Sequence, residues 1–464
     1  MRIPLALAVA LAAGCSSKDS PTAPATPAVL GAVPAATPSP TPKPAPAAIS
    51  IAGKGAPRAQ TPPDVPELGP AGPSQVRSTA PEIYVRNLAA QRQALDQRVI
   101  RFPDDAGARA SLAAWHSDQM QLDGNLDHAV EADRLLTEAI AKRPDEPKYH
   151  RQRAGVRAHM HRFREAKAEL EGVLAKHPDD QAAQRALGWV TRNLGDWKGA
   201  EPLIESSTRG TTFDDYGKRA LLAFLAGDID AADEALRRAH GAYNNVHPVP
   251  LAWIDLQRGH LRLRTGRWEE ARTFFRRAYA RLPQNFEVAE HLAEVESLLG
   301  KHTESLRIYD EVVAATGLPE FIGAKAGVLR ALGRTADADA ALLEADRAWR
   351  ALLAKYPEAM AAHAIHFWLE DKKDPAEALK WAEMNLGVRQ DPDSLLLAAR
   401  ARAANGDLDG ARALLIRVEA YPLRVDEVFE GIAGVKRALG DAAGAEAALA
   451  AARALNPKAG VTHP

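Results

Sequence analysis

Cysteine, aromatic residues and excess charge are all scarce in this chain of 464 residues. Its single cysteine excludes an internal disulfide framework and any metal or iron–sulfur site built from several cysteines. Aromatic residues make up 6% of the chain, and its 59 Lys and Arg nearly cancel its 60 Asp and Glu. A net charge of −1 provides no long-range attraction for nucleic acid, so we expect no nucleic-acid partner.

Signatures of catalysis are also missing. No strand pattern leads into a glycine-rich phosphate-binding loop, and the only cysteine stands at position 15, outside the part that is patterned to fold. The strongest metal pattern is His363 with His366 and Glu370, whereas helical zinc sites more often use two ligands four residues apart. We therefore expect no enzyme activity, no metal or other cofactor, and no small-molecule substrate. An enzyme with an unrecognised site is the less favoured alternative.

The first fifteen residues have the form of a secretory signal. Arg2 provides a short positive start, and the apolar run 3–13 is too short to cross a bilayer as a helix. The end of this segment, from Leu11 to Cys15, resembles the lipobox of bacterial lipoproteins, in which a cysteine is lipidated and becomes the new N-terminus. An ordinary secretory signal with an incidental cysteine is the alternative.

The lipobox resemblance implies a location. It predicts that Cys15 carries lipid chains that anchor the protein in the bacterial cell envelope. Ser16 follows the cysteine, where aspartate would favour retention at the inner membrane in this class of protein. We therefore expect an outer-membrane protein that faces the periplasm.

Residues 16–81 form a segment rich in proline and alanine. Between Pro21 and Pro81 lie 16 of the 32 prolines of the chain. Proline fixes the backbone and removes a hydrogen-bond donor, and few large apolar side chains are present to offset the entropy of ordering. The composition predicts a disordered tether, with a proline-rich ligand for a partner domain as the alternative.

From residue 82 onward the pattern is helical, and it repeats. A helix is expected over 82–104, a repeat array over 105–457 and a short tail over 458–464. Small residues recur at intervals of 32 to 40 positions, mostly 33 or 34. They are Ala132, Ala166, Ala200, Ala232, Ala271, Ser305, Ala338, Ala378, Ala411 and Ala445.

Other residues keep a constant offset from these ten. A second small residue usually stands twelve positions earlier, which predicts a close crossing of two helices. Glycine usually stands five positions earlier, where a left-handed residue would end the first helix of each pair. Four prolines follow the second helix, and Asp145, Asp179 and Asp393 are expected to cap the helix that comes next.

This pattern is the signature of the tetratricopeptide repeat, and residues 105–457 resemble that family. The resemblance implies an all-α, right-handed superhelical solenoid of about ten helical hairpins. Two longer spacings predict insertions, one at 242–247 and one as a longer second helix that runs through Trp349. Trp197 and Trp268 are expected in the core.

In this family the first helices line a concave groove that holds peptides or partner helices. Carried over to this sequence, the early groove positions are Lys148, Arg151, Arg185, Trp189, Arg192 and Asn193. Such a basic stretch would suit an acidic or C-terminal segment, although a solvated helix face is the competing interpretation. The sequence thus predicts a membrane-anchored scaffold that assembles envelope proteins in secretion, pilus formation, polysaccharide export or outer-membrane assembly. A lipoprotein that binds carbohydrate or peptidoglycan is the alternative.

Overall fold

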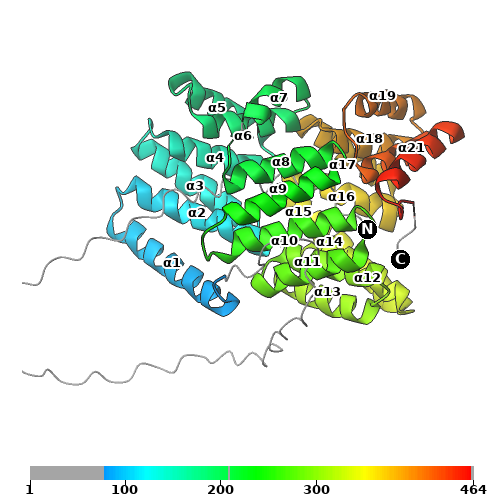
Figure 1. The fold of residues 1–464 in the computed structure, drawn as a ribbon, viewed down its shortest axis with the longest axis horizontal. Coiled ribbons are helices and arrows are strands. Elements are labelled where there is room, and N and C mark those ends of the chain that lie inside the picture. The colour runs from blue at the N-terminus through cyan, green and yellow to red at the C-terminus, as the bar shows by residue number, and fades with distance from the viewer. Residues whose placement is uncertain (1–77, 207–209, 461–464) are drawn as a thin grey trace, which may run out of the picture.

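The computed structural model describes residues 78–206 and 210–460 of the chain. The predicted signal, the lipidated Cys15 and nearly all of the predicted tether lie outside these residues. The described part is all-helical, and α1 (Pro81–Arg101) precedes ten hairpins (Figure 1). Among the described helices none is long and apolar enough to cross a membrane.

Each hairpin pairs a first helix with a second. The first helices are α2 (Ala106–Asp123), α4 (Pro147–His159), α6 (Gln181–Asn193), α8 (Phe213–Leu225), α10 (Pro248–Leu263), α12 (Phe286–Leu298), α14 (Pro319–Ala331), α16 (Pro357–His366), α18 (Pro392–Ala404) and α20 (Asp426–Ala438). The second helices are α3 (Asp127–Lys142), α5 (Phe163–Lys176), α7 (Trp197–Ser206), α9 (Ile229–Ala242), α11 (Trp268–Arg281), α13 (His302–Thr316), α15 (Thr335–Lys355), α17 (Pro375–Val388), α19 (Leu408–Glu419) and α21 (Ala442–Leu455). A π-helical turn, η2 (Phe367–Asp371), extends α16. The long α15 includes Trp349, as predicted.

The turn inside each hairpin needs a left-handed residue. All seven glycines at the predicted position have φ between 70° and 93°. Three hairpins have no glycine there: His161 (φ 56°) and Lys373 (φ 54°) take the same conformation in two of them, and in the first hairpin Gly124 (φ 69°) ends α2 three positions earlier. His161 and Lys373 are the only non-glycine residues of the described chain with positive φ, so the geometry of the turn is kept even where its usual residue is absent.

Small residues meet where the two helices of a hairpin cross, as the spacing predicts. Ala154 and Ala166 are both fully enclosed, with at most 1% of either residue exposed. In the hairpin where serine replaces alanine, Ser305 Oγ donates a hydrogen bond to the Ala293 carbonyl across the crossing (2.8 Å). Larger side chains here would force the helix backbones apart.

The predicted caps of three first helices are wrong by one or two positions. Helix α4 is capped by Glu146, α6 by Asp180 and α18 by Asp391, and each side chain accepts from a backbone N–H of the first turn. Asp145 instead pairs with Lys176 (2.8 Å). The periodic pattern locates a helix start only to within a residue or two, because fixed offsets carry no information on the local turn.

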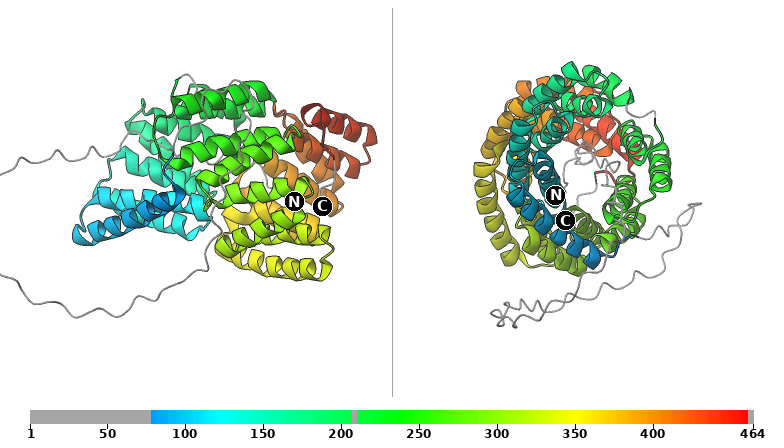
Figure 2. Two further views of the ribbon diagram at one scale, coloured as in Figure 1. Left: turned by 60° about the horizontal axis from the view of Figure 1, so that its bottom comes forward. Right: turned by 90° about the vertical axis from the view of Figure 1, so that its left-hand side faces the viewer.

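The hairpins wind around a central axis, and the chain completes more than one turn. Figure 2 shows the helices arranged as a ring when the array is viewed along this axis. Contacts between successive turns join residues far apart in sequence. Asn285 Nδ2 donates to the carbonyl of Gln121 (2.8 Å), 164 positions away, and Lys355 Nζ lies 2.6 Å from Asp127, 228 positions away. The second turn therefore packs directly on the first.

Trp197 and Trp268 lie at this junction between turns, which corrects their predicted place in the core. Both are half-buried. The Trp197 ring meets Tyr421 edge-on, with centroids 5.9 Å apart, and Lys458 Nζ sits 3.5 Å from the centroid of the Trp268 ring. These tryptophans thus help to hold one turn of the superhelix against the next.

Helix α1 connects the start of the array to α10, in the last hairpin of the first turn. The backbone N–H of Thr79 donates to Val246 O (2.8 Å), within the predicted insertion. Tyr84, which is 5% exposed, packs with Leu122, Ala252 and Leu282. The chain that precedes the array therefore enters next to α10.

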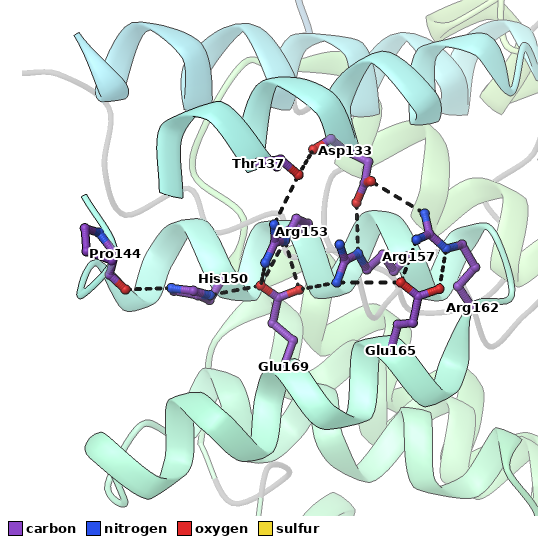
Figure 3. A network of polar contacts seen from close by, with 9 residues as sticks. All are labelled: Asp133, Thr137, Pro144, His150, Arg153, Arg157, Arg162, Glu165 and Glu169. Carbon is purple, nitrogen blue, oxygen red and sulfur yellow. Dashed lines mark hydrogen bonds and ion pairs between the residues drawn. The ribbon is translucent and has the colours of Figure 1, made fainter. Parts of the chain in front are cut away.

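Ion pairs join neighbouring helices in a recurring arrangement, in which a buried acid lies between two arginines of the facing helix. In Figure 3, Glu169 of α5 accepts from Arg153 Nη2 (2.6 Å) and Arg157 Nη1 (3.1 Å) of α4. Arg157 also reaches back to Asp133 of α3 (2.9 Å), so three helices share one network. The same arrangement recurs at Asp233, Asp255 and Glu296. Breaking such a pair would leave a buried charge without a partner.

We expect the contact of Arg264 with Glu427 to hold the two turns together. The two side chains form an ion pair between α10 and α20, and both are 17% exposed. Arg264→Glu would replace attraction by repulsion, at a cost on the order of 1–3 kcal/mol. Small-angle X-ray scattering should then show a larger radius of gyration, and adding Glu427→Arg should restore it. Arg267→Glu is the matched control, because Arg267 pairs with Glu270 inside its own helix turn. Unchanged scattering for Arg264→Glu would contradict the expectation.

Candidate functional site: a cavity along the superhelix axis

The first helices enclose a cavity of about 2340 Å³. Residues of α1 and of every first helix from α2 to α18 line it, while few residues of the second helices reach it. This arrangement follows from the close packing of small residues within each hairpin, which turns the first helices inward. Because the turns stack, the surface enclosed is a channel rather than an open groove.

All six predicted groove residues line this cavity. Lys148 and Arg151 come from α4, and the other four from α6. Arg151 forms an ion pair with Asp180, the cap of α6. Asn193 Nδ2 donates to the Trp189 carbonyl (2.8 Å), while its own carbonyl accepts from the backbone N–H of Gln390 in the next turn (3.0 Å).

Two of the six residues are buried within the wall of the cavity and expose almost none of their surface to it. Trp189 is 2% exposed and Arg192 is 6% exposed. The Arg192 guanidinium lies over two rings, 5.4 Å from the centroid of Trp189 and 4.9 Å from that of Trp197. Burial lowers the pKa of Arg192, although the nearby carboxylates oppose this effect. The aromatic face expected for a ligand is therefore already occupied by a cation of the protein itself.

Lys218 of α8 extends the basic side of the cavity, and the repeat rule did not select it. It is 5% exposed and lines the cavity next to Asp214 and Asp215. Burial, and then the charge of Arg185, lower the pKa of Lys218. Lys218 precedes Ala232 by 14 positions, whereas Arg185 precedes Ala200 by 15, so a fixed offset passes over it.

Helices α12, α14 and α16 contribute an acidic side. Burial raises the pKa of Glu287, and it raises the pKa of Glu290 to about 8. Glu320 lies 3.1 Å from Nδ1 of His363. His366, by contrast, pairs with Glu370 (3.3 Å), so the histidines of the sequence pattern have separate partners and do not converge.

One further cluster on α12 was missed by the search for metal patterns. Glu290, His291 and Glu294 bring one donor atom each to within 4.8 Å of one another. Adjacent residues in a helix usually diverge, so the pair Glu290 and His291 carried no signal in the sequence. Their convergence depends on side-chain conformations that burial imposes.

Comparisons with known proteins identify the repeat. Family models of the tetratricopeptide repeat match residues 156–214 and 252–295. No curated protein matches the chain in sequence. Similar solved structures include the TPR domain of P58(IPK), with 18% identity, 77% of this chain and 97% of that chain covered, and a TM-score of 0.26. Yeast Tom70 is 16% identical, with 80% of this chain and 92% of that chain covered and a TM-score of 0.32. Human IFIT1 is 12% identical, with 79% of this chain and 94% of that chain covered and a TM-score of 0.39.

The identification rests on the repeat itself. Ten hairpins share a left-handed turn, eight of them have small residues on both sides of the helix crossing, and two stretches match the family in sequence. The described residues therefore form an array of tetratricopeptide repeats, an all-helical scaffold of the kind through which proteins bind one another.

Proposed function

We propose that this protein is a lipid-anchored scaffold of the bacterial cell envelope that binds an acidic segment of a partner protein inside its superhelix. The observation that carries the proposal is the run of cations on three successive first helices, with Lys148 on α4, Arg185 on α6 and Lys218 on α8 lining one side of the cavity. A partner held there would be drawn into an envelope assembly such as a secretion, pilus, export or outer-membrane complex.

The size and electrostatics of the cavity support a peptide as the ligand. Its volume of about 2340 Å³ is more than twice the roughly 1,000 Å³ of the larger small-molecule sites. In the described chain no hydrogen bond or ion pair joins Arg185 to another side chain, and burial, followed by the charge of Arg185, lowers the pKa of Lys218. Carboxylates of a partner would form charge-assisted hydrogen bonds with these cations.

The lipid anchor is supported by the sequence around Cys15. Because Thr79, just before α1, donates to Val246 O, the segment that would carry the anchor joins the array beside α10. A tether of about 60 residues would let the array reach partners well away from the membrane surface.

The test is crosslinking in cells of the tagged full-length protein, followed by capture from the envelope fraction and mass spectrometry. We expect a small, reproducible set of envelope proteins, recovered at least tenfold less with Arg185→Glu. The matched control is Arg164→Glu on α5, an exposed arginine outside the cavity. An unchanged set for Arg185→Glu would exclude the cavity as the binding site. A capture without any specific protein would favour peptidoglycan, which a pull-down on purified peptidoglycan would detect.

The anchor has its own test. Cells fed an alkyne fatty acid should label the wild-type protein but not Cys15→Ala, and the variant should leave the membrane fraction. Labelling that persists in Cys15→Ala would refute lipidation at this residue.

A further inference from the structure

The cluster on α12 has the geometry of a metal site. Nδ1 of His291 lies 3.2 Å from Oε2 of Glu290 and 3.1 Å from Oε2 of Glu294. Zinc binds such nitrogen and oxygen ligands at about 2.0–2.2 Å, and at those lengths two ligand atoms of a tetrahedral site lie about 3.3 Å apart. An ion could therefore take the place of the proton on His291 with only small shifts of the side chains.

The donors are buried and held in place. Glu290 is 2% exposed and His291 is 8% exposed. Tyr309 O–H donates to Oε1 of Glu290 (3.3 Å), which turns that oxygen away and leaves Oε2 toward the histidine. Oε2 makes no hydrogen bond to any described residue, a costly state for a buried carboxylate. A hydroxyl that orients a ligand in this manner is typical of the outer shell of metal sites.

A second, independent observation comes from the neighbouring helix. His260 of α10 is 7% exposed, and neither of its ring nitrogens has a hydrogen-bond partner within the described ranges. Its ring meets that of His291 edge-on, with centroids only 4.2 Å apart. Its ring therefore stands beside the cluster on α12 with two buried nitrogens that lack a partner among the described residues.

We propose that α10 and α12 bind one divalent transition-metal ion of the zinc class, with Glu290, His291 and Glu294 as ligands and His260 as the fourth. Two carboxylates would balance the charge of the ion. Arg264, whose charge also acts on Glu294, is itself paired with Glu427. Since Glu290 and His291 line the cavity, the ion has a path to the site, and once bound it would fasten the first helices of two successive repeats to each other.

The test is a titration of the full chain, stripped with a chelator, with zinc chloride as the probe. Calorimetry and elemental analysis should give one ion per chain, and Glu290→Gln, His291→Ala and His260→Ala should each weaken binding at least tenfold. His302→Ala is the control, because His302 lies on α13 and contacts Ser297 rather than the cluster. Circular dichroism of the conservative Glu290→Gln variant checks that a loss of binding is not a loss of fold.

Proton release distinguishes a built site from adventitious binding to other histidines. Nδ1 of His291 lies 3.2 Å from one carboxylate oxygen and 3.1 Å from another, and such oxygens accept from an N–H, so an ion bound there must displace that proton. The heat of binding should accordingly vary with the ionisation enthalpy of the buffer, by at least one proton per ion. Equal affinity in the wild type and the three variants would overturn the proposal and leave a buried ion pair in its place. Neither result depends on whether a protein partner binds in the cavity.

Discussion

Asp233→Asn should destabilise the α9–α10 junction by about 3–5 kcal/mol, the cost typical of breaking a buried ion pair. Asp233 lies 2.9 Å from Arg258 Nε and 3.0 Å from Arg262 Nη2, and both arginine side chains are only 9% exposed. The Arg258 guanidinium also lies over Phe274, 4.5 Å from the centroid of the ring. Asparagine keeps the volume but removes the charge, so Arg258 would lose its counter-ion and Arg262 would keep only Glu270, 3.5 Å away.

The measurement is urea unfolding together with hydrogen exchange resolved by mass spectrometry, because repeat arrays can open locally. Exchange should accelerate in α9 and α10 before distant hairpins respond. Glu234→Gln is the matched control: Glu234 is the next residue, pairs with Arg237 and Arg238 at the surface, and is 45% exposed. Loss of the Glu234 charge should change the free energy of unfolding by less than about 0.5 kcal/mol. Equal effects of the two variants would show that burial of the pair contributes nothing.

The effect of Asp233→Asn should also depend on pH. Burial by itself would raise the pKa of Asp233, but the hydrogen bonds and charges of Arg258 and Arg262 outweigh it and lower the pKa. A carboxyl with a lowered pKa stabilises the fold fully above its ordinary pKa of 3.8, and this stabilisation is lost as pH falls through the folded value. The difference between wild type and variant should therefore be constant from neutral pH to about pH 5 and should shrink below it.

Gly259→Ala should destabilise the α10–α11 hairpin by about 1–3 kcal/mol through overpacking. A Cβ added at Gly259 would lie 2.3 Å from Cε1 and 2.5 Å from Cδ1 of Phe275. The Phe275 ring cannot retreat, because it is fully buried and packs against His260 and His291, with centroids 5.6 Å away in both cases.

Gly172→Ala provides the matched control, for which the expected change in stability has the opposite sign. Gly172 lies inside α5, and a Cβ there would meet no atom within 4 Å. Alanine should stabilise that helix by about 0.5–1 kcal/mol, because it loses less backbone entropy on folding. Denaturation midpoints of the two variants should thus move in opposite directions. A Gly259→Ala variant as stable as wild type would mean that the two helices can separate at no cost.

The repeat was accessible from sequence because its constraints are local. Gly266 and its six equivalents need a left-handed backbone, and Ala154 and Ala166 need a close crossing; both demands recur at a constant offset within one hairpin. Residues that break the pattern could still be placed, since His161 and Lys373 stand at the same offset as the glycines. The alternation of helices follows from these demands, whereas the inward direction of the first helices was implied by the resemblance to the repeat family.

The candidate site was accessible only in part. The offset rule selected Arg185 but passed over Lys218, because Arg185 stands 15 positions before Ala200 whereas Lys218 stands 14 before Ala232. It also treated Trp189 as an exposed aromatic surface, whereas the next turn and Arg192 cover it. Convergence of Glu290 with His291 depends on side-chain directions that helical spacing does not encode.

The sequence by itself determined the helical hairpin and its number of copies, since both depend on residues within about 40 positions of one another. Only the tertiary structure decided that the superhelix stacks turn on turn, for this rests on pairs such as Asp127 with Lys355, 228 positions apart. Small rotations between successive hairpins add up along the array, so no local pattern sets which distant residues meet. The closed cavity, its basic and acidic sides and the His260–His291 contact are all consequences of that summed rotation.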